Sequence, residues 1–236
     1  DQLVYSTKYE GQHARFLALS TPPLPPLLVR AVHSNMGVDV DSGLYRHQVL
    51  AIDALRTGKH LALSTETSSG KSLVYNLPVV EAVLGNPATT ALYLFPTKAL
   101  AQDQLRATNA MCGQDLSHLT SGTTDHKNVL LPVLSAICDG DSGVQAREAV
   151  KMEAGRGGAN IILTNPDMLH HTILPSHTAY KRIFKSLRYV VIDEGHCYRG
   201  TFGAHIACVM RRLVRVCLLY KLKLPQFIIC SATISN

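Results

Sequence analysis

Apolar and polar positions alternate with two different periods along most of this chain. Short, nearly continuous apolar runs occupy residues 60–64, 90–95, 160–164, 187–193 and 226–231, with 133–138 as a sixth candidate. Longer patterns of helical period lie between or after them, at residues 71–84, 98–111, 144–154 and 202–220. Continuous apolar runs are typical of parallel strands buried on both faces. The order therefore predicts one α/β domain with a largely parallel central sheet and helices on both faces.

The beginning of the chain follows a different pattern. Prolines crowd residues 22–26, which predicts a stiff extended connector, and a short apolar helix pattern follows over residues 27–36. We expect residues 1–43 to be an N-terminal extension and connector, and residues 44–236 to form the main domain. Residues 112–128 are rich in Gly, Ser, Thr, Asp, Asn and His, which predicts a solvent-exposed insertion.

Composition restricts the class of protein. Of 236 residues, 46% are hydrophobic and 17% are charged, so the chain can bury a large core and is neither disordered nor fibrous. Lys and Arg number 23 against 17 Asp and Glu, a net charge of +6 that leans toward a polyanionic partner. Six Cys form no Cys-x-x-Cys pair, so we expect reduced core thiols and no zinc or iron–sulfur site.

The sequence shows neither the pattern of a membrane span nor that of an N-terminal targeting signal. No apolar run reaches the roughly 18 residues of a membrane span, and the N-terminus lacks a basic region followed by an apolar stretch. We therefore expect an intracellular protein that does not enter a membrane. The first residue is Asp1 and the chain ends shortly after Thr233, which suggests a fragment of a longer chain.

The strongest local signal for chemistry is a loop placed directly after an apolar strand and directly before a helix. Such a loop aims backbone N–H groups and the positive helix end at a phosphate, while a lysine reaches the outer phosphates and a hydroxyl holds Mg²⁺. We expect Mg²⁺–ATP to be bound there by Thr65, Glu66, Thr67, Ser68, Ser69, Gly70, Lys71 and Ser72. The alternative is an ordinary helix N-terminus capped by serine.

Two carboxylates follow the apolar run that precedes residue 193. Asp193 and Glu194 come at the carboxyl end of a buried strand, where open α/β sheets bind their ligands. Asp193 can hold Mg²⁺ together with Ser72, and Glu194 can orient or deprotonate an attacking water. The alternative is a strand end whose acids cap the next helix.

A third strand ends in Ser231, Ala232 and Thr233. The order of a loop lysine, then Asp-Glu-x-His, then Ser-Ala-Thr, each after its own strand, resembles the first motor domain of superfamily two helicases. The resemblance implies a RecA-like P-loop NTPase fold. It also implies that Lys71 and His196 belong to the catalytic set and that the Ser-Ala-Thr segment couples hydrolysis to movement.

Other segments match further motifs of these motors. The resemblance implies that Gln48 contacts the adenine edge of the nucleotide. It also implies nucleic-acid contacts at Pro96, Thr97, Lys98, Gly140, Asp141, Thr164, Asn165 and Pro166. Strand-to-helix junctions offer free N–H groups and hydroxyls to phosphates, but helix capping explains Thr and Asn there equally well.

Residues 138–142, 163–170 and 193–203 narrow the resemblance to RecQ-related repair helicases that carry a C-terminal zinc-binding domain. The resemblance implies an ATP-driven 3′ to 5′ DNA translocase acting in repair, nuclear in a eukaryote and otherwise cytoplasmic. Its expected partners are single-stranded DNA or a 3′-tailed duplex, a second RecA-like domain and the zinc-binding domain of the same chain. The departures are Gly195 in place of the usual Ala, Thr65 and Ser68 in the phosphate loop, and the insertion at residues 112–128.

Three other functions compete with this hypothesis. Phosphate contacts do not distinguish DNA from RNA, so an RNA-directed or chromatin-directed motor of the same superfamily is the first. A silent nucleic-acid scaffold would not need Lys71, Asp193 and Glu194. A small-molecule kinase would not need Gln48, Pro96-Thr97-Lys98 and Ser231-Ala232-Thr233 together. Because the second domain is expected to supply arginine fingers, we expect the fragment to bind ATP but scarcely to hydrolyse it.

Basic and imidazole side chains cluster in two further places. The helix pattern at residues 202–220 carries Arg211, Arg212 and Arg215, and we favour a solvated face over a nucleic-acid contact. His170 and His171 are expected on a helix surface.

Overall fold

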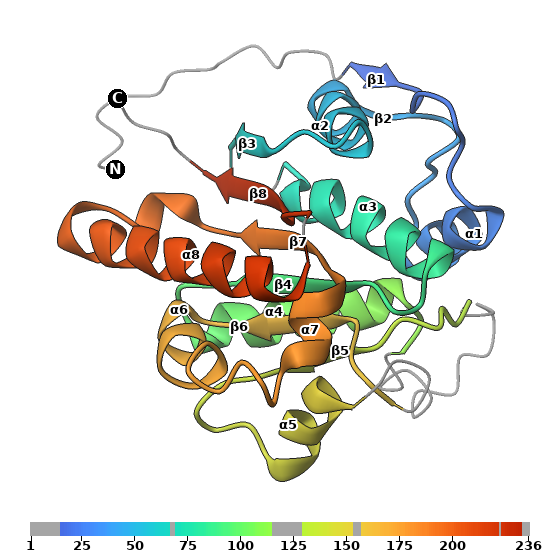
Figure 1. Ribbon diagram of the computed structural model, residues 1–236. Helices are drawn as coiled ribbons and strands as arrows, with labels where there is room; N and C mark the ends of the chain where they lie inside the picture. Colours follow the sequence, from blue (N-terminus) through green and yellow to red (C-terminus); the bar gives the residue numbers. More distant parts are fainter. Residues whose placement is uncertain (1–14, 67–68, 115–128, 153–156, 222, 233–236) are drawn as a thin grey trace, which may run out of the picture.

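The computed structural model describes residues 15–66, 69–114, 129–152, 157–221 and 223–232. Its core is a six-stranded parallel sheet in the order β3-β8-β7-β4-β6-β5 (Figure 1). The strands are β3 (Leu61–Ser64), β4 (Thr90–Leu94), β5 (Ser135–Ile137), β6 (Ile161–Thr164), β7 (Leu187–Ile192) and β8 (Gln226–Ser231). The α/β prediction is confirmed, and every predicted apolar run contains a strand.

Helices cover both faces of the sheet (Figure 1). One face carries α1 (Pro26–Met36), α2 (Arg46–Arg56), α3 (Lys71–Gly85) and α4 (Lys98–Met111). The other carries α5 (Val144–Lys151), α6 (Pro166–Met168), the π-helical turn η2 (Leu169–Ile173), α7 (Lys181–Ser186) and α8 (Gly200–Tyr220). Central strands feed both layers, since Tyr93 packs into the first core and Leu92 and Leu94 into the second.

The N-terminal segment is packed onto the domain rather than lying apart from it. Strand β1 (Phe16–Leu17) pairs antiparallel with β2 (Leu44–Tyr45), just before α2. Helix α1 buries Leu28, Ala31 and Val32 in the same core as α2 and α3. The main domain was predicted to begin at residue 44. In the structure, residues 15–43 also contribute to its hydrophobic core.

Several details differ from the sequence predictions. Strand β3 is not buried, because it lies at an edge of the sheet and alternates half-buried with exposed residues. Cys112 is buried rather than part of an exposed insertion, and residues 115–128 of that segment lie outside the described residues. Four cysteines are buried as predicted, but Cys197 and Cys208 are exposed. Within the described part of the chain, no helix is long and apolar enough to span a membrane.

Candidate nucleotide and nucleic-acid site

The phosphate loop follows β3 and leads into α3. Lys71 Nζ donates hydrogen bonds to the carbonyl oxygens of Thr65 and Glu66, at 3.0 and 2.8 Å. The hydroxyls of Thr65 and Ser69 lie 2.7 Å apart, so one donates to the other. These contacts fold the loop around the lysine, while Thr67 and Ser68 lie outside the described residues.

Gln48 is buried against the phosphate loop. Its Nε2 donates to the Gly70 carbonyl at 3.2 Å, and its Oε1 accepts from the Tyr45 N–H at 3.1 Å. Gly70 adopts φ +73°, and a Cβ there would meet Gln48 Nε2 at 2.5 Å. His47 Nε2 lies 3.0 Å from the Ser69 carbonyl, a contact that sequence reasoning did not single out. The start of α2 and the phosphate loop are thus fitted to each other.

Asp193 lies at the end of β7 and is 8% exposed. Its Oδ2 accepts a hydrogen bond from the Tyr75 hydroxyl at 3.0 Å, and its Oδ1 accepts from the Glu194 N–H at 2.8 Å. Burial raises the pKa of Asp193, while both donors and the Lys71 charge act to lower it. The ammonium from one strand end and the carboxylate from another are therefore brought to one edge of the sheet.

Sequence reasoning did not identify Tyr75. The residue lies one turn into α3 and is fully buried, and its hydroxyl also lies 3.1 Å from Gln104 Oε1 of α4. Because its neighbours in the sequence are apolar, Tyr75 was interpreted as an ordinary core residue of an amphipathic helix. The only available signal was a polar tip in an apolar stretch, since a buried Tyr hydroxyl normally finds a partner.

Glu194 holds an unusual backbone conformation. Its φ is +51°, the only positive value among the described non-glycine residues. Its Oε2 is buried and accepts no hydrogen bond, although His196 Nδ1 lies 3.1 Å away. The same His196 nitrogen lies 3.5 Å from the Ser231 hydroxyl, so His196 stands between the acid and the end of β8.

Gly195 is explained by close packing rather than by backbone conformation. A Cβ at this position would meet Ile229 Cγ2 at 2.9 Å and the Cys230 carbonyl oxygen at 3.3 Å. The usual alanine would therefore require β8 or the Ile229 side chain to shift. Ala232 is half-buried, and Thr233 lies outside the described residues.

The predicted nucleic-acid residues lie at the carboxyl ends of β4, β5 and β6. Thr97 caps α4 by accepting the Leu100 N–H at 3.3 Å, and Pro96 precedes it. Lys98 is exposed and forms an ion pair with Asp141 from the loop after β5. Gly140 in that loop is exposed, and its carbonyl accepts from Arg147 at 2.9 Å.

The end of β6 is built around its own cap. The Thr164 hydroxyl donates to the Cys138 carbonyl at 2.5 Å, which ties β6 to the segment after β5. Asn165 Oδ1 accepts the Met168 N–H at 2.8 Å, and Pro166 is the first residue of α6. In this structure Thr97 and Asn165 act as helix caps, the alternative that the sequence left open.

The site is suited to Mg²⁺–ATP. The Asp193 carboxylate and the Ser72 hydroxyl are oxygen donors of the kind that Mg²⁺ prefers. Among the described residues, Lys71 Nζ donates to two carbonyl oxygens, which phosphate oxygens can replace, and Gly70 lets the loop approach Gln48 closely because a Cβ there would meet Gln48 Nε2 at 2.5 Å. The described residues therefore fit the group that the sequence predicts.

Comparisons with known proteins agree with this geometry. The model of the DEAD/DEAH box helicase family matches residues 45–236. The chain belongs to this family. The predicted resemblance to superfamily two motors is thereby confirmed.

Several relatives of this family are similar to the chain over almost its whole length. It is 41% identical to the Bacillus subtilis protein described as an uncharacterized ATP-dependent helicase, YprA, over 92% of the chain. It is 36% identical to the ATP-dependent helicase hrq1 of Schizosaccharomyces pombe over 100% of the chain. The crystal structure of the DUF1998 helicase MrfA bound to DNA and AMPPNP superposes with a TM-score of 0.80 and 38% identity, over 97% of this chain.

The similarity covers only part of these relatives. The chain spans 26% of YprA, 21% of hrq1 and 29% of the MrfA chain.

Proposed function

We propose that this chain is the first RecA-like motor domain of an ATP-dependent 3′ to 5′ DNA helicase that acts in DNA repair. The observation that carries the proposal is the meeting of Lys71, Asp193 and Glu194 at one edge of the sheet, beside the strand ends that carry the predicted nucleic-acid residues. Relatives described as helicases, one of them bound to DNA and AMPPNP, support DNA over RNA.

The chain's own residues divide the work of binding and hydrolysis. We expect Lys71 to exchange its two carbonyl acceptors for phosphate oxygens, and Gln48, which supports the loop at Gly70, to contact the adenine edge. Ser72 and Asp193 would hold Mg²⁺, whose charge, when bound, offsets that of the transferring phosphoryl group. We expect the Glu194 carboxylate, whose side chain is 28% exposed, to orient the attacking water and accept its proton.

His196 connects this chemistry to movement. It lies 3.1 Å from Glu194 Oε2 and 3.5 Å from the Ser231 hydroxyl at the end of β8. We expect a shift of Ser231 to reach Glu194 through this one imidazole. This arrangement supports coupling through Ser231, Ala232 and Thr233, which remains a prediction.

The proposal extends to the rest of the protein. A second RecA-like domain would supply arginine fingers worth about 10³ to 10⁵ in rate, so the isolated chain is expected to bind ATP and hardly hydrolyse it. A C-terminal zinc-binding domain of the same chain would complete the helicase. We expect a nuclear protein in a eukaryote and a cytoplasmic one in a bacterium.

The test is ATP hydrolysis by the full-length protein with and without single-stranded DNA or RNA, at one stated salt concentration. We expect stimulation by DNA, loss of nucleotide binding in Lys71→Ala, and binding without hydrolysis in Glu194→Gln. Stimulation by RNA alone would assign the protein to the RNA-directed motors. No stimulation by either polymer, or full activity in Glu194→Gln, would contradict the proposal.

A further inference from the structure

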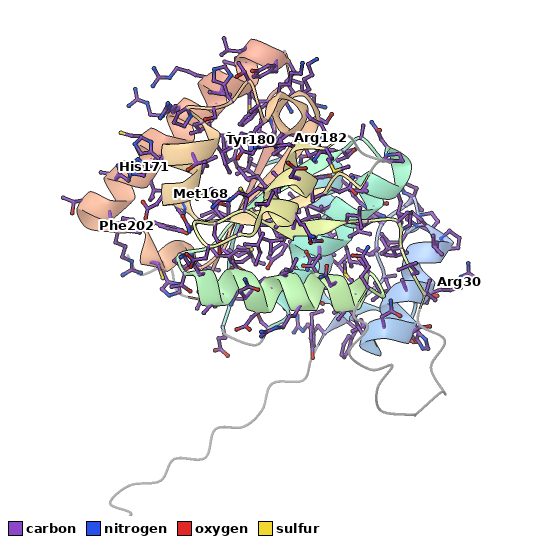
Figure 2. All side chains as sticks on the ribbon, turned by 90° about the horizontal axis from the view of Figure 1, so that it is seen from below. Arg30, Met168, His171, Tyr180, Arg182 and Phe202 are labelled. Atoms are coloured by element: carbon purple, nitrogen blue, oxygen red, sulfur yellow. The ribbon has the colours of Figure 1, made fainter. Side chains whose placement is uncertain are left out.

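Three imidazole rings meet on the surface between η2 and α8. The His170 ring centre lies 4.5 Å from that of His171 and 5.1 Å from that of His205. We call these three residues the histidine cluster. His171 and His205 are exposed, and His170 is half-buried. Figure 2 shows His171 on the same side of the molecule as Met168 of α6 and Phe202, near the start of α8.

A guanidinium adds a permanent charge to the histidine cluster. Arg212 Nη1 donates to the His170 carbonyl at 3.2 Å and lies 3.5 Å from His170 Nδ1. Among the described residues, no carboxylate comes within ion-pair distance of the three imidazoles or of Arg212. The face is therefore rich in nitrogen donors and poor in neutralising acids.

The position of the histidine cluster connects it to the proposed nucleic-acid contacts. Helix α6 begins at the Asn165 cap and runs directly into η2, which carries His170 and His171. His205 is five residues into α8, which follows the segment of Glu194 and His196. His170 and His171 lie six and seven residues past the end of β6, about 9 to 11 Å at about 1.5 Å per helical residue, and the His205 ring joins them through its contact with His170.

A metal site does not explain the arrangement. No group of three His, Cys, Asp or Glu side chains within the described ranges is arranged to hold a metal ion. An anion does suit it, because a phosphate accepts hydrogen bonds from imidazolium and guanidinium donors alike.

Resting on the proposed function, we propose that the histidine cluster is a second phosphate contact for the bound nucleic-acid strand, and that it binds more tightly as its imidazoles take up protons. Each added proton places a positive charge beside a phosphate. Binding of the strand must in turn draw protons onto the rings, since linkage is reciprocal.

Electrostatics of the free protein agree with this coupling. Burial lowers the pKa of His170, and His171, His205 and Arg212 lower it further. The exposed Asp167 acts in the opposite direction on the pKa of His170, and its influence is the smallest of these. A phosphate bound at this face would screen that repulsion and let a proton bind near neutral pH, where histidine ordinarily titrates.

The test is the affinity of the full-length protein for a single-stranded oligothymidine, measured by fluorescence anisotropy at about pH 8 and about pH 6 at fixed ionic strength without nucleotide. We expect binding to tighten by about threefold to tenfold per proton taken up at the lower pH. The variant His171→Gln/His205→Gln should lose most of the tightening between the two pH values. His33→Gln, which removes an exposed imidazole on α1, is the matched control and should keep it.

Calorimetry gives an independent measure of the same event. Binding heats in two buffers of different ionisation enthalpy should show uptake of about one proton, reduced in the double variant and unchanged in His33→Gln. Equal pH dependence in the double variant and the unaltered protein would overturn the inference while leaving the proposed function intact. Failure to bind DNA at either pH would overturn both.

Discussion

The Tyr75 hydroxyl lies 3.0 Å from Asp193 Oδ2 and 3.1 Å from Gln104 Oε1. The Tyr75 hydroxyl proton is therefore shared by two acceptors. One is the carboxylate of Asp193, the proposed Mg²⁺ ligand, and the other is the Gln104 amide oxygen on α4, the helix that Thr97 caps. A shift of α4 toward a nucleic-acid strand would change how firmly the proton is held by Asp193. The contact joins the two proposed binding sites through the core of the domain.

Replacement of this hydroxyl should weaken communication between the sites. In Tyr75→Phe we expect the stimulation of ATP hydrolysis by single-stranded DNA to fall about fivefold or more, the lower range of allosteric coupling. The fold should survive, with a loss of about 1 kcal/mol for the missing hydrogen bond. Hydrolysis with and without DNA, together with thermal unfolding, measures both effects.

Tyr93→Phe is the matched control for this variant. Tyr93 is equally buried, but its hydroxyl donates to Asn76 Oδ1 at 2.9 Å and reaches neither site. It should lose similar stability and keep full stimulation by DNA. If both variants keep the same stimulation ratio, Tyr75 has a structural role only.

Asp193 should destabilise the nucleotide-free protein at neutral pH. Burial raises the pKa of Asp193, so the folded chain holds this proton more tightly than the unfolded chain. The stability lost through ionisation therefore grows as pH rises from the unfolded pKa, about 3.9, through the raised folded pKa. Asp193→Asn should unfold at a higher temperature than the unaltered protein near neutral pH, and the two should converge in acid.

The asparagine can be accommodated at this place. Its amide can donate to the Tyr75 hydroxyl, which then donates to Gln104, and its carbonyl can still accept the Glu194 N–H. Thermal unfolding without nucleotide, across the acid to neutral range, is the measurement. Asp103→Asn, at an exposed position on α4, should leave the profile unchanged. A lower unfolding temperature for Asp193→Asn at neutral pH would contradict the prediction.

The sequence predicted which residues form the nucleotide site, but not the buried contacts that join this site to other parts of the domain. Lys71 and Asp193 could be placed together because each follows its own strand, and the carboxyl ends of parallel strands share one edge. Strand order itself was not predictable, so the exposure of β3 at the sheet edge was missed. The Tyr75 contact joins residues 118 positions apart and depends on how α3 is rotated against β7. No local pattern encodes that rotation.

The ion pair of Lys98 with Asp141 should oppose nucleic-acid binding. Both residues were predicted to contact the nucleic-acid strand. A phosphate that binds Lys98 must, however, displace the Asp141 carboxylate. The side chains are 50% and 79% exposed, so the pair is weak and salt-sensitive. Asp141→Asn should tighten DNA binding by about twofold to fivefold at low salt, and less at high salt.

Binding titrations at two salt concentrations test this prediction. Asp103→Asn is again the matched control. Asp103 pairs with Arg106 on the exposed side of α4, so its substitution removes the same charge without releasing Lys98. Equal tightening in both variants would mean that net charge, rather than release of Lys98, is responsible.

Gly70 should be required for nucleotide binding because of Gln48 as well as its backbone. A left-handed conformation costs a non-glycine residue about 1–2 kcal/mol. At Gly70, with φ +73°, a Cβ would also lie 2.5 Å from Gln48 Nε2 and displace it. Gly58 has φ +86° but nothing within 4 Å of its Cβ position. Gly70→Ala and Gly58→Ala should lose similar stability. Only Gly70→Ala should also weaken nucleotide binding, by about tenfold or more, which corresponds to about 1.4 kcal/mol or more of binding free energy.

A double-mutant cycle separates the two causes. Gln48→Ala removes the amide that the new Cβ would strike, so its combination with Gly70→Ala should bind a fluorescent ATP analogue more tightly than the sum of the single losses predicts. The residual loss in the double variant then measures backbone strain together with the missing support from Gln48. Strictly additive losses would show that the two residues act independently, and that the loop depends on Gly70 for its backbone alone.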